Sequence, residues 1–569
     1  MGKIAGWLRL MALITLPGIG AARGQEADLV FTNANVITLK SHGDRATAVA
    51  IKGDKIIAVG DVKEHIGAQT QVIDLHGQTL VPGFNDVHQH PAPLYSWDKP
   101  YASLELDTVT SMHSLIALLK RKAAITPKGM LIRGTAYNEV KLGAQPIRDS
   151  LDKASTEHPI IISQASGHVS AVNSYMLRIN HVDKDTKDPP GGALERYPNG
   201  EPDGIIKESA RGLLREGTRP PNPSTEDELE GYRLYFHALL ASGITSIGDC
   251  WTTPAKVTMY EEMVKEHFPL RFNLYIGVDY LDDVLDGKIP RTDNEFLRIQ
   301  GIKIFQGNSL SGKTCWLYEP YDTVNPVSGQ RDYFGIPPAR TQRALDSLVL
   351  KIHRAGLQIA CHSNGDREID MVLAAMEYAQ RHYPRVDVRH RIEHCSITNE
   401  EILQRLKADS IIPVFHSYAN ELGDQLKVYG ARRMSMLMPT KSATDMGIPW
   451  AMHSDFPVSR YEPMKRLDGA VNRLSPSGVI IGANQRIGAE DAIYAYCVGG
   501  AYTSHEEGRK GRIESGMLAD MVVLSADPTA VYPGAIKDIQ VMMTILGGKV
   551  VYVMREGATP NIFLKANEK

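Results

Sequence analysis

The chain has 569 residues, of which 43% are apolar and 23% charged, and this composition excludes a disordered or low-complexity protein. Its length fits one barrel-sized catalytic domain with a smaller companion better than a single ordinary domain. The formal net charge of −3 gives no basic field for a phosphate backbone. We therefore expect a small-molecule partner and no nucleic acid.

The first residues have the order of a secretory signal peptide. The basic residues Lys3 and Arg9 come first, an apolar run extends from Leu10 to Ile19, and the small residues Gly20 to Ala22 follow. We expect residues 1–24 to be a signal peptide and the protein to be exported, to the periplasm or the medium, with a short membrane anchor or a mispredicted start codon as the alternatives. No other stretch approaches the roughly 18 consecutive apolar residues of a permanent membrane span.

The cysteines do not indicate a disulfide framework. Their number is odd and none forms a C-x-x-C pair, so we expect free, buried thiols and no structural zinc knuckle. The five are Cys250, Cys315, Cys361, Cys395 and Cys497.

Both ends of the chain predict short β-strands separated by Gly and Asp turns. The runs are residues 28–38, 48–59 and 71–75 near one end and 521–524, 541–546 and 550–553 near the other, the last two joined by Gly547-Gly548. We expect residues 26–83 and 512–557 to form one small composite β-sandwich.

The middle of the chain alternates between helical and strand patterns. From Thr341 the apolar residues follow helical spacing as far as Ile352, Gly356 ends the helix, and residues 357–361 have the length of a strand that leads to His362. This alternation predicts an α/β fold in which residues 84–511 form a (β/α)8 TIM-type barrel. Residues 95–235 fit the pattern less well, and we interpret them as an insertion that caps the barrel mouth.

Five side chains are predicted to meet at that mouth. His88 and His90 are two apart, which puts both imidazoles on one side of a strand. His362, His394 and Asp455 each end a later strand, and the carboxyl ends of barrel strands share one face. Four imidazoles and a carboxylate suit zinc, with iron, manganese or cobalt as alternatives. By the same alternation, the cysteines beside His362 and His394 should face away.

The order of short motifs resembles the metal-dependent amidohydrolase superfamily, in particular the amidohydrolase-3 group with its YtcJ-like proteins and N-substituted formamide deformylases. The matching stretches, in family order from about Asp28 to Val553, are VPGFNDVHQH, SGHVSAVNS, GEPDGIIKES, SGITSIGD, GIKIF, HSNGDREID, RIEHC, HSDFPV and GRIESGMLADMVVLSADP. The resemblance implies a (β/α)8 barrel with a composite β-sandwich.

The resemblance also implies that the site binds one or two divalent ions and indicates which residues bind each ion. His88, His90 and Asp455 would hold one ion, and His362 and His394 a second. Lys303, in GIKIF, matches a position that in many members is a carboxylated lysine bridging both ions, and the alternative is a surface lysine at a strand end.

Two departures from the family pattern lie beside this site, and both bear on substrate preference. Gly307-Asn308 follows Lys303 where members usually have Asp-Gly, and His453 precedes Ser-Asp where members usually have Gly. Further candidates for substrate contact are His168 and Asn173, which match the family's substrate-facing motif, together with Trp251, His416 and His453. Structural roles are the alternative, as for Asp249 and Asp366.

Residues 307–314 also fit the P-loop pattern G-x-x-x-x-G-K-[ST]. The segment after Lys313 reaches Pro320 within two turns, so the helix that a P-loop requires is not expected. Nucleotide hydrolysis therefore stays a minor alternative.

These observations predict a hydrolase that cleaves a non-peptide C–N bond, most simply an N-acyl or N-formyl amide. A metal-bound hydroxide would attack the carbonyl, and Asp455 would accept the water's proton and return it to the leaving nitrogen. Two alternatives stay open: hydrolysis of esters, lactones or cyclic ureides at the same site, and a metal-binding or regulatory barrel without catalysis. A homodimer is possible.

Overall fold

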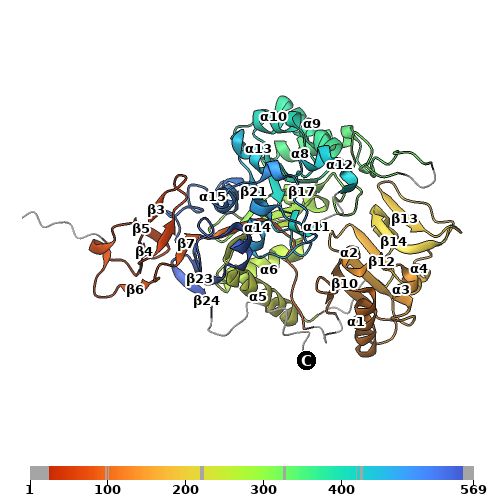
Figure 1. The fold of residues 1–569 in the computed structure, drawn as a ribbon, viewed down its shortest axis with the longest axis horizontal. Coiled ribbons are helices and arrows are strands. Elements are labelled where there is room, and N and C mark those ends of the chain that lie inside the picture. The colour runs from red at the N-terminus through yellow and green to blue at the C-terminus, as the bar shows by residue number, and fades with distance from the viewer. Residues whose placement is uncertain are drawn as a thin grey trace, which may run out of the picture.

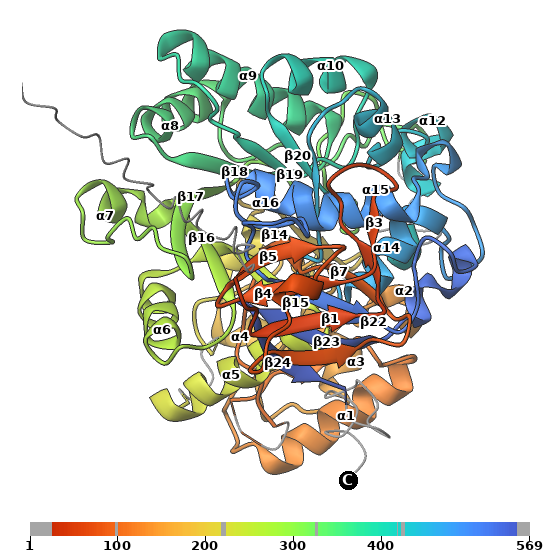
Figure 2. The same cartoon turned by 90° about the vertical axis from the view of Figure 1, so that its left-hand side faces the viewer.

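The computed structural model describes residues 25–554 apart from 97–98, 100, 218–222, 325–327, 418 and 423–426. The predicted signal peptide and the last three residues of the predicted 512–557 segment lie outside this part of the chain. A central barrel is flanked by a β-sheet unit, on the left in Figure 1, and by an inserted α/β unit on the right. Figure 2 views the molecule from the side of the β-sheet unit.

The barrel consists of eight parallel strands that pair in chain order. They are β8 (Phe84–Gln89), β15 (Ile244–Thr252), β16 (Arg271–Gly277), β17 (Leu297–Phe305), β18 (Gln358–Ser363), β19 (Arg391–His394), β20 (Ile412–His416) and β21 (Ala451–His453). The ring closes just beyond β8 and β21, where the Asp455 N–H donates to the His88 carbonyl (3.0 Å) and the His90 N–H to the Phe456 carbonyl (2.7 Å). Closure therefore occurs at the carboxyl ends of the strands.

Helices cover the outside of the barrel, so strands such as β18 are buried on both faces. The helices are α5 (Thr225–Ala241), α6 (Pro254–Lys265), α7 (Leu281–Leu285), α8 (Gln342–Arg354), α9 (Asp366–His382), α10 (Glu400–Ala408), α11 (Ala419–Leu422), α12 (Gly430–Met434), α13 (Thr440–Asp445), α14 (Pro463–Asn472), α15 (Ala489–Tyr494) and α16 (Gly500–Thr503). Helix α8 begins where its sequence predicts, because the Thr341 hydroxyl caps the Ala344 N–H at 3.4 Å. Gly356 follows its end with φ +79°, a left-handed conformation that glycine adopts without strain.

Both ends of the chain build the β-sheet unit, which has two sheets. One has the order β5–β4–β1–β6 and the other β24–β23–β22–β7–β2–β3. Their bounds are β1 (Leu29–Thr32), β2 (Asn35–Ile37), β3 (Arg45–Ala46), β4 (Val49–Lys52), β5 (Lys55–Val59), β6 (Gln71–Asp74), β7 (Thr79–Pro82), β22 (Met521–Leu524), β23 (Val541–Leu546) and β24 (Lys549–Val553). Ile51 from the first sheet and Val36 and Val523 from the second lie in one buried cluster. The predicted barrel with a composite β-sandwich is confirmed.

The inserted unit has a mixed six-stranded sheet of order β13–β14–β12–β11–β10–β9 and apolar clusters of its own. Its elements are β9 (Leu104–Glu105), α1 (Met112–Ile125), β10 (Ile132–Tyr137), α2 (Glu139–Leu142), α3 (Arg148–Asp152), β11 (Ile160–Gln164), β12 (Val169–Val172), α4 (Ser174–Ile179), β13 (Gly192–Arg196) and β14 (Pro202–Glu208). Helix α5 begins within the predicted insertion of residues 95–235, extends beyond it to Ala241, and packs on barrel strand β15. The separate unit therefore ends before α5.

All five cysteines are buried free thiols. Within the described ranges, no helix is both long enough and apolar enough to cross a bilayer.

Candidate metal centre

The first and last strands of the barrel bring three donors together. His88 lies in β8 and His90 directly follows it, and their Nε2 atoms are 3.3 Å apart, as expected for residues two apart on one side of a strand. Asp455 lies two residues beyond β21, with its Oδ1 atom 3.4 Å from His88 Nε2 and 3.3 Å from His90 Nε2. One donor atom from each of the three lies within 4.8 Å of the other two.

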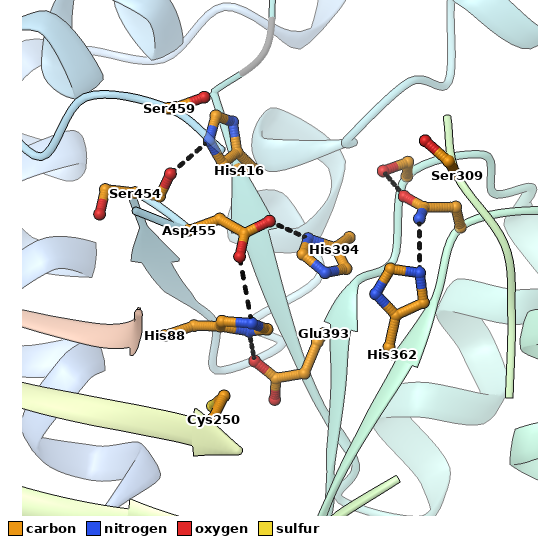
Figure 3. A network of polar contacts seen from close by, with 12 residues as sticks. His88, Cys250, Ser309, His362, Glu393, His394, His416, Ser454, Asp455 and Ser459 are labelled. Atoms are coloured by element: carbon orange, nitrogen blue, oxygen red, sulfur yellow. Dashed lines mark hydrogen bonds and ion pairs between the residues drawn. The ribbon is translucent and has the colours of Figure 1, made fainter. Parts of the chain in front are cut away.

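Three more predicted residues adjoin this group. The buried Lys303 Nζ, on β17, is 3.2 Å from His88 Nε2. The rings of His362 and His394 have centroids 4.5 Å apart, and Asp455 Oδ2 is 3.9 Å from His394 Nδ1. Figure 3 shows Asp455 between His88 and His394, with His362 beside them. The structure therefore brings all six predicted residues into one cluster.

Burial sets the protonation of this cluster. It lowers the pKa of His88, His362 and His394 well below 6.5, so these imidazoles are neutral and have lone pairs to offer. Burial alone would raise the pKa of Asp455, but the hydrogen bond with His90 and the nearby positive groups lower it, so this side chain is a carboxylate at neutral pH. Neutral imidazoles and a carboxylate facing one another fit a divalent ion.

Glu393 holds His88 from the interior of the barrel, a contact that the motif analysis missed. The His88 Nδ1–H donates to Glu393 Oε2 at 2.5 Å, and Arg391 donates to both Glu393 oxygens at 2.7 Å. The Arg391 guanidinium also donates to the Tyr275 hydroxyl at 2.8 Å. The signal in the sequence was the spacing of Arg391 and Glu393, which puts them on one side of a strand.

An open cavity of about 640 Å³ lies over the cluster. His90, His362, His394 and Asp455 line it. The inserted unit supplies another part of its wall, formed by Ser166, Gly167, His168, Gly191, Glu208, Ser209 and Arg211. The inserted unit therefore covers the donors and shapes the space above them.

The two substrate-contact candidates of the inserted unit have different positions. His168 lines the cavity with its ring 4.9 Å from that of His362, and its Nδ1 is 2.7 Å from Glu208 Oε2. Asn173 does not line the cavity. Its side-chain oxygen caps the Met176 N–H at 3.1 Å and its amide donates to main-chain carbonyls, so the predicted substrate contact is corrected to a structural role at the start of α4.

Of the remaining candidates, Trp251 lies beside the cavity wall, because its ring centroid is 5.2 Å from that of the cavity-lining Phe305. His453 stacks on His88 with centroids 4.8 Å apart, and His416 lies 5.1 Å from His453. Both histidines are buried and neither lines the cavity. His453 therefore packs against one of the donors, and substrate contact through His416 or His453 stays a prediction.

Asp249 and Asp366 have structural roles. Asp249 accepts hydrogen bonds from the Tyr260 hydroxyl (3.0 Å) and Lys256 (3.2 Å), and Asp366 accepts from the Tyr318 N–H (3.1 Å). Within the described residues, no helix follows Lys313 before α8, and the Thr314 hydroxyl is bonded to Glu208. The P-loop pattern therefore lacks the helix N-terminus that would bind phosphates.

A family model described as the amidohydrolase family matches residues 71–552. The chain is 26% identical over 545 residues to YtcJ of Bacillus subtilis, provisionally named an amidohydrolase, with 91% of this chain and 98% of that protein covered. It is also 26% identical over 558 residues to the N-substituted formamide deformylase of Arthrobacter pascens, with 93% and 99% covered.

The fold is similar to that of an uncharacterized metal-dependent hydrolase from Pyrococcus horikoshii OT3. The TM-score is 0.67 at 23% identity, and the match covers 89% of this chain and 99% of that structure. The family match extends over most of the chain, including every residue of the donor cluster. The chain therefore belongs to the amidohydrolase family of hydrolases.

Proposed function

We propose that this enzyme hydrolyses a non-peptide C–N bond in a small molecule, namely an N-acyl or N-formyl amide. The observation that carries the proposal is the convergence of six side chains, from the ends of five barrel strands, beneath a cavity of small-molecule size. Similarity to an N-substituted formamide deformylase over nearly its whole length supports the choice of bond.

The six donors would hold divalent metal, with zinc favoured by the nitrogen and oxygen ligand set. In this assignment His88, His90 and Asp455 would hold one ion, His362 and His394 would hold a second, and Lys303, if carboxylated, would offer an oxygen ligand to both. Bound there, the metal would supply acidification of a water molecule and polarisation of the substrate carbonyl.

The residues of the chain then handle the proton and the substrate. Asp455 accepts a proton from the attacking water and returns it to the leaving nitrogen, since its carboxylate lines the cavity beside His88 and His90. Glu393 keeps the Nδ1–H tautomer of His88, so Nε2 faces the donors. His168, oriented by Glu208, contacts the substrate from the inserted unit.

The test measures metal content and turnover on the same preparation. Purified enzyme is assayed by mass spectrometry for bound metal, treated with chelator, and reconstituted with zinc, manganese, cobalt or iron. Each form is offered N-formyl and N-acetyl amides, matched esters, lactones and cyclic ureides. We expect amide turnover that chelator abolishes and metal restores. Preferred turnover of esters, lactones or ureides would overturn the assigned bond, and metal-loaded protein without turnover of any of these compounds would point to a non-catalytic barrel.

A further inference from the structure

Two arginines line the cavity without an acidic partner. Arg211 belongs to the short 3-10 helix Ser209–Leu213 of the inserted unit, and Arg340 lies just before α8. Arg211 donates to the Gly167 carbonyl, and Arg340 donates to the Phe305 carbonyl at 2.7 Å. Within the described residues neither guanidinium forms an ion pair with a carboxylate.

Both guanidinium groups keep donors available to a ligand. Each has five N–H bonds, and the contacts with protein oxygens use one terminal nitrogen of each group, Nη1. Arg211 is exposed and Arg340 is half-buried, so neither is closed off from the cavity. These unused N–H groups lie in the wall of the same cavity as the metal donors.

The charges of the cavity wall do not balance. Glu208 is the acidic residue near Arg211, but its Oε2 atom is bonded to His168 at 2.7 Å and its Oε1 atom to the Thr314 hydroxyl. Asp455 belongs to the donor cluster. Two guanidinium charges against the one carboxylate of Glu208 leave one positive charge unbalanced, which favours a ligand with a single negative charge.

We propose that the substrate carries one carboxylate, which Arg211 and Arg340 bind while the scissile amide faces the donor cluster. This inference rests on the proposed amide hydrolysis and adds the substrate class. Arginine suits the task because its planar guanidinium binds a carboxylate through two parallel hydrogen bonds. One arginine comes from the inserted unit and the other from the barrel, so such a substrate would contact both parts.

The experiment uses two probes that differ by the carboxylate alone: racemic N-formylphenylalanine and N-(2-phenylethyl)formamide. Binding is measured by calorimetry on the metal-loaded Asp455→Asn variant, so that turnover does not interfere, and hydrolysis is measured on the wild-type enzyme. We expect the carboxylate probe to bind at least about tenfold more tightly, as is typical of hydrogen bonds to charged groups. The corresponding phosphonate, a dianion, should bind more weakly than the carboxylate.

Further substitutions in the Asp455→Asn variant test whether the two arginines cause the tighter binding of the carboxylate probe. Arg211→Gln and Arg340→Gln should each reduce binding of the carboxylate probe about tenfold or more without changing binding of the neutral probe. The lysine variants should retain part of the preference, because the charge is kept while the planar fork is lost. Arg343→Gln is the matched control: Arg343 is exposed on α8 and does not line the cavity, so neither probe should be affected.

The outcomes separate the two proposals. Equal binding of both probes, or a preference that survives both glutamine substitutions, overturns the carboxylate class, while hydrolysis of the neutral formamide would leave the proposed function standing. Arginine-dependent binding of the carboxylate probe without hydrolysis of either formamide would support the ligand class and count against formamide hydrolysis. Tighter binding of the phosphonate would overturn the assignment of a carboxylate.

Discussion

His88 Nδ1 lies 2.5 Å from Glu393 Oε2, inside the barrel and out of contact with solvent. A carboxylate can only accept this hydrogen bond, so Nδ1 carries the proton and Nε2 presents its lone pair to the donor cluster. Arg391 binds Glu393 through two nitrogens and fixes the carboxylate in turn. The position of one metal donor therefore depends on a buried ion pair that does not itself face the cavity.

Glu393→Gln should weaken metal binding. A glutamine can present its NH2 group to His88, which would favour the other tautomer and turn the proton toward the cluster. We expect metal affinity to fall by about 10- to 100-fold, as is usual when a carboxylate partner of a metal-binding histidine is lost. Competition with a chromogenic chelator measures this change.

Glu393→Gln also breaks the buried ion pair with Arg391, which should lower the stability of the fold. This effect must be distinguished from a lower affinity for metal. Glu506→Gln is the matched control, because Glu506 is buried, pairs with Lys510 at 2.8 Å and also contacts Asn273, near the start of β16. It should lower the thermal midpoint without changing metal affinity. Unchanged affinity in Glu393→Gln, or equal losses of affinity in both variants, would refute the positioning role of Glu393.

The sequence predicted much of this cluster because strand ends leave a periodic signal. His88 and His90 are two apart, and their nitrogen atoms are indeed close together. The same alternation does not explain how Glu393 and His394, which are adjacent, both reach the site. His394 has φ +68° and Asp455 has φ +57°, and these left-handed conformations turn both side chains away from the ordinary strand pattern. Such strain depends on the surrounding fold and is invisible in a local pattern.

The inserted unit was less predictable for a related reason. Its sheet mixes parallel and antiparallel pairs, and β14 lies between β12 and β13, so no simple alternation marks it. Asn173 matched a substrate-facing motif, yet a buried helix cap requires the same residue type. Only the packed structure distinguishes Asn173 from His168, which lines the cavity.

Asp455→Asn should keep most of the bound metal and lose most of the turnover. The amide oxygen can still act as a ligand, but it does not accept a proton from water, so we expect kcat to fall by about 100- to 10,000-fold. Metal analysis and steady-state kinetics on one preparation test this. Asp366→Asn is the control, since Asp366 is buried near the end of β18 but does not line the cavity. Near wild-type kcat in Asp455→Asn would disprove the assigned role.

Lys303→Gln should reduce the metal content from about two ions per chain to about one, because it removes the group that we propose bridges the two ions. Growth with carbon-13 bicarbonate should give the wild-type enzyme a carbamate signal in its NMR spectrum, and Lys303→Gln should lack it. Lys510→Gln removes another buried lysine, one that is ion-paired with Glu506, and should keep the signal. A wild-type spectrum without the signal would exclude carboxylation.

Stability should depend on pH through the contact between the barrel and the β-sheet unit. Asp520, just before β22, binds Arg271 of β16 at 2.7 and 3.0 Å, and both side chains are buried. Burial alone would raise the pKa of Asp520, but the charge and hydrogen bonds of Arg271 lower it below its ordinary value. A carboxyl group with a depressed folded-state pKa stabilises the fold above the unfolded-state pKa of about 3.9, and this contribution is lost as the pH falls further.

Asp520→Asn should therefore cost about 3–5 kcal/mol at pH 7, because it leaves the Arg271 charge buried without its partner. The difference from wild type should shrink as the pH is lowered below about 4, because Asp520 of the unfolded wild-type chain then takes up a proton while Asp520 of the folded chain stays ionised until a lower pH. Urea denaturation across this pH range measures both effects. Asp28→Asn is the matched control: Asp28 and Lys52 form an exposed pair, so its removal should cost less than about 1 kcal/mol. A loss in Asp520→Asn that is equally small, or that does not change with pH, would show that the buried pair does not hold the two parts together.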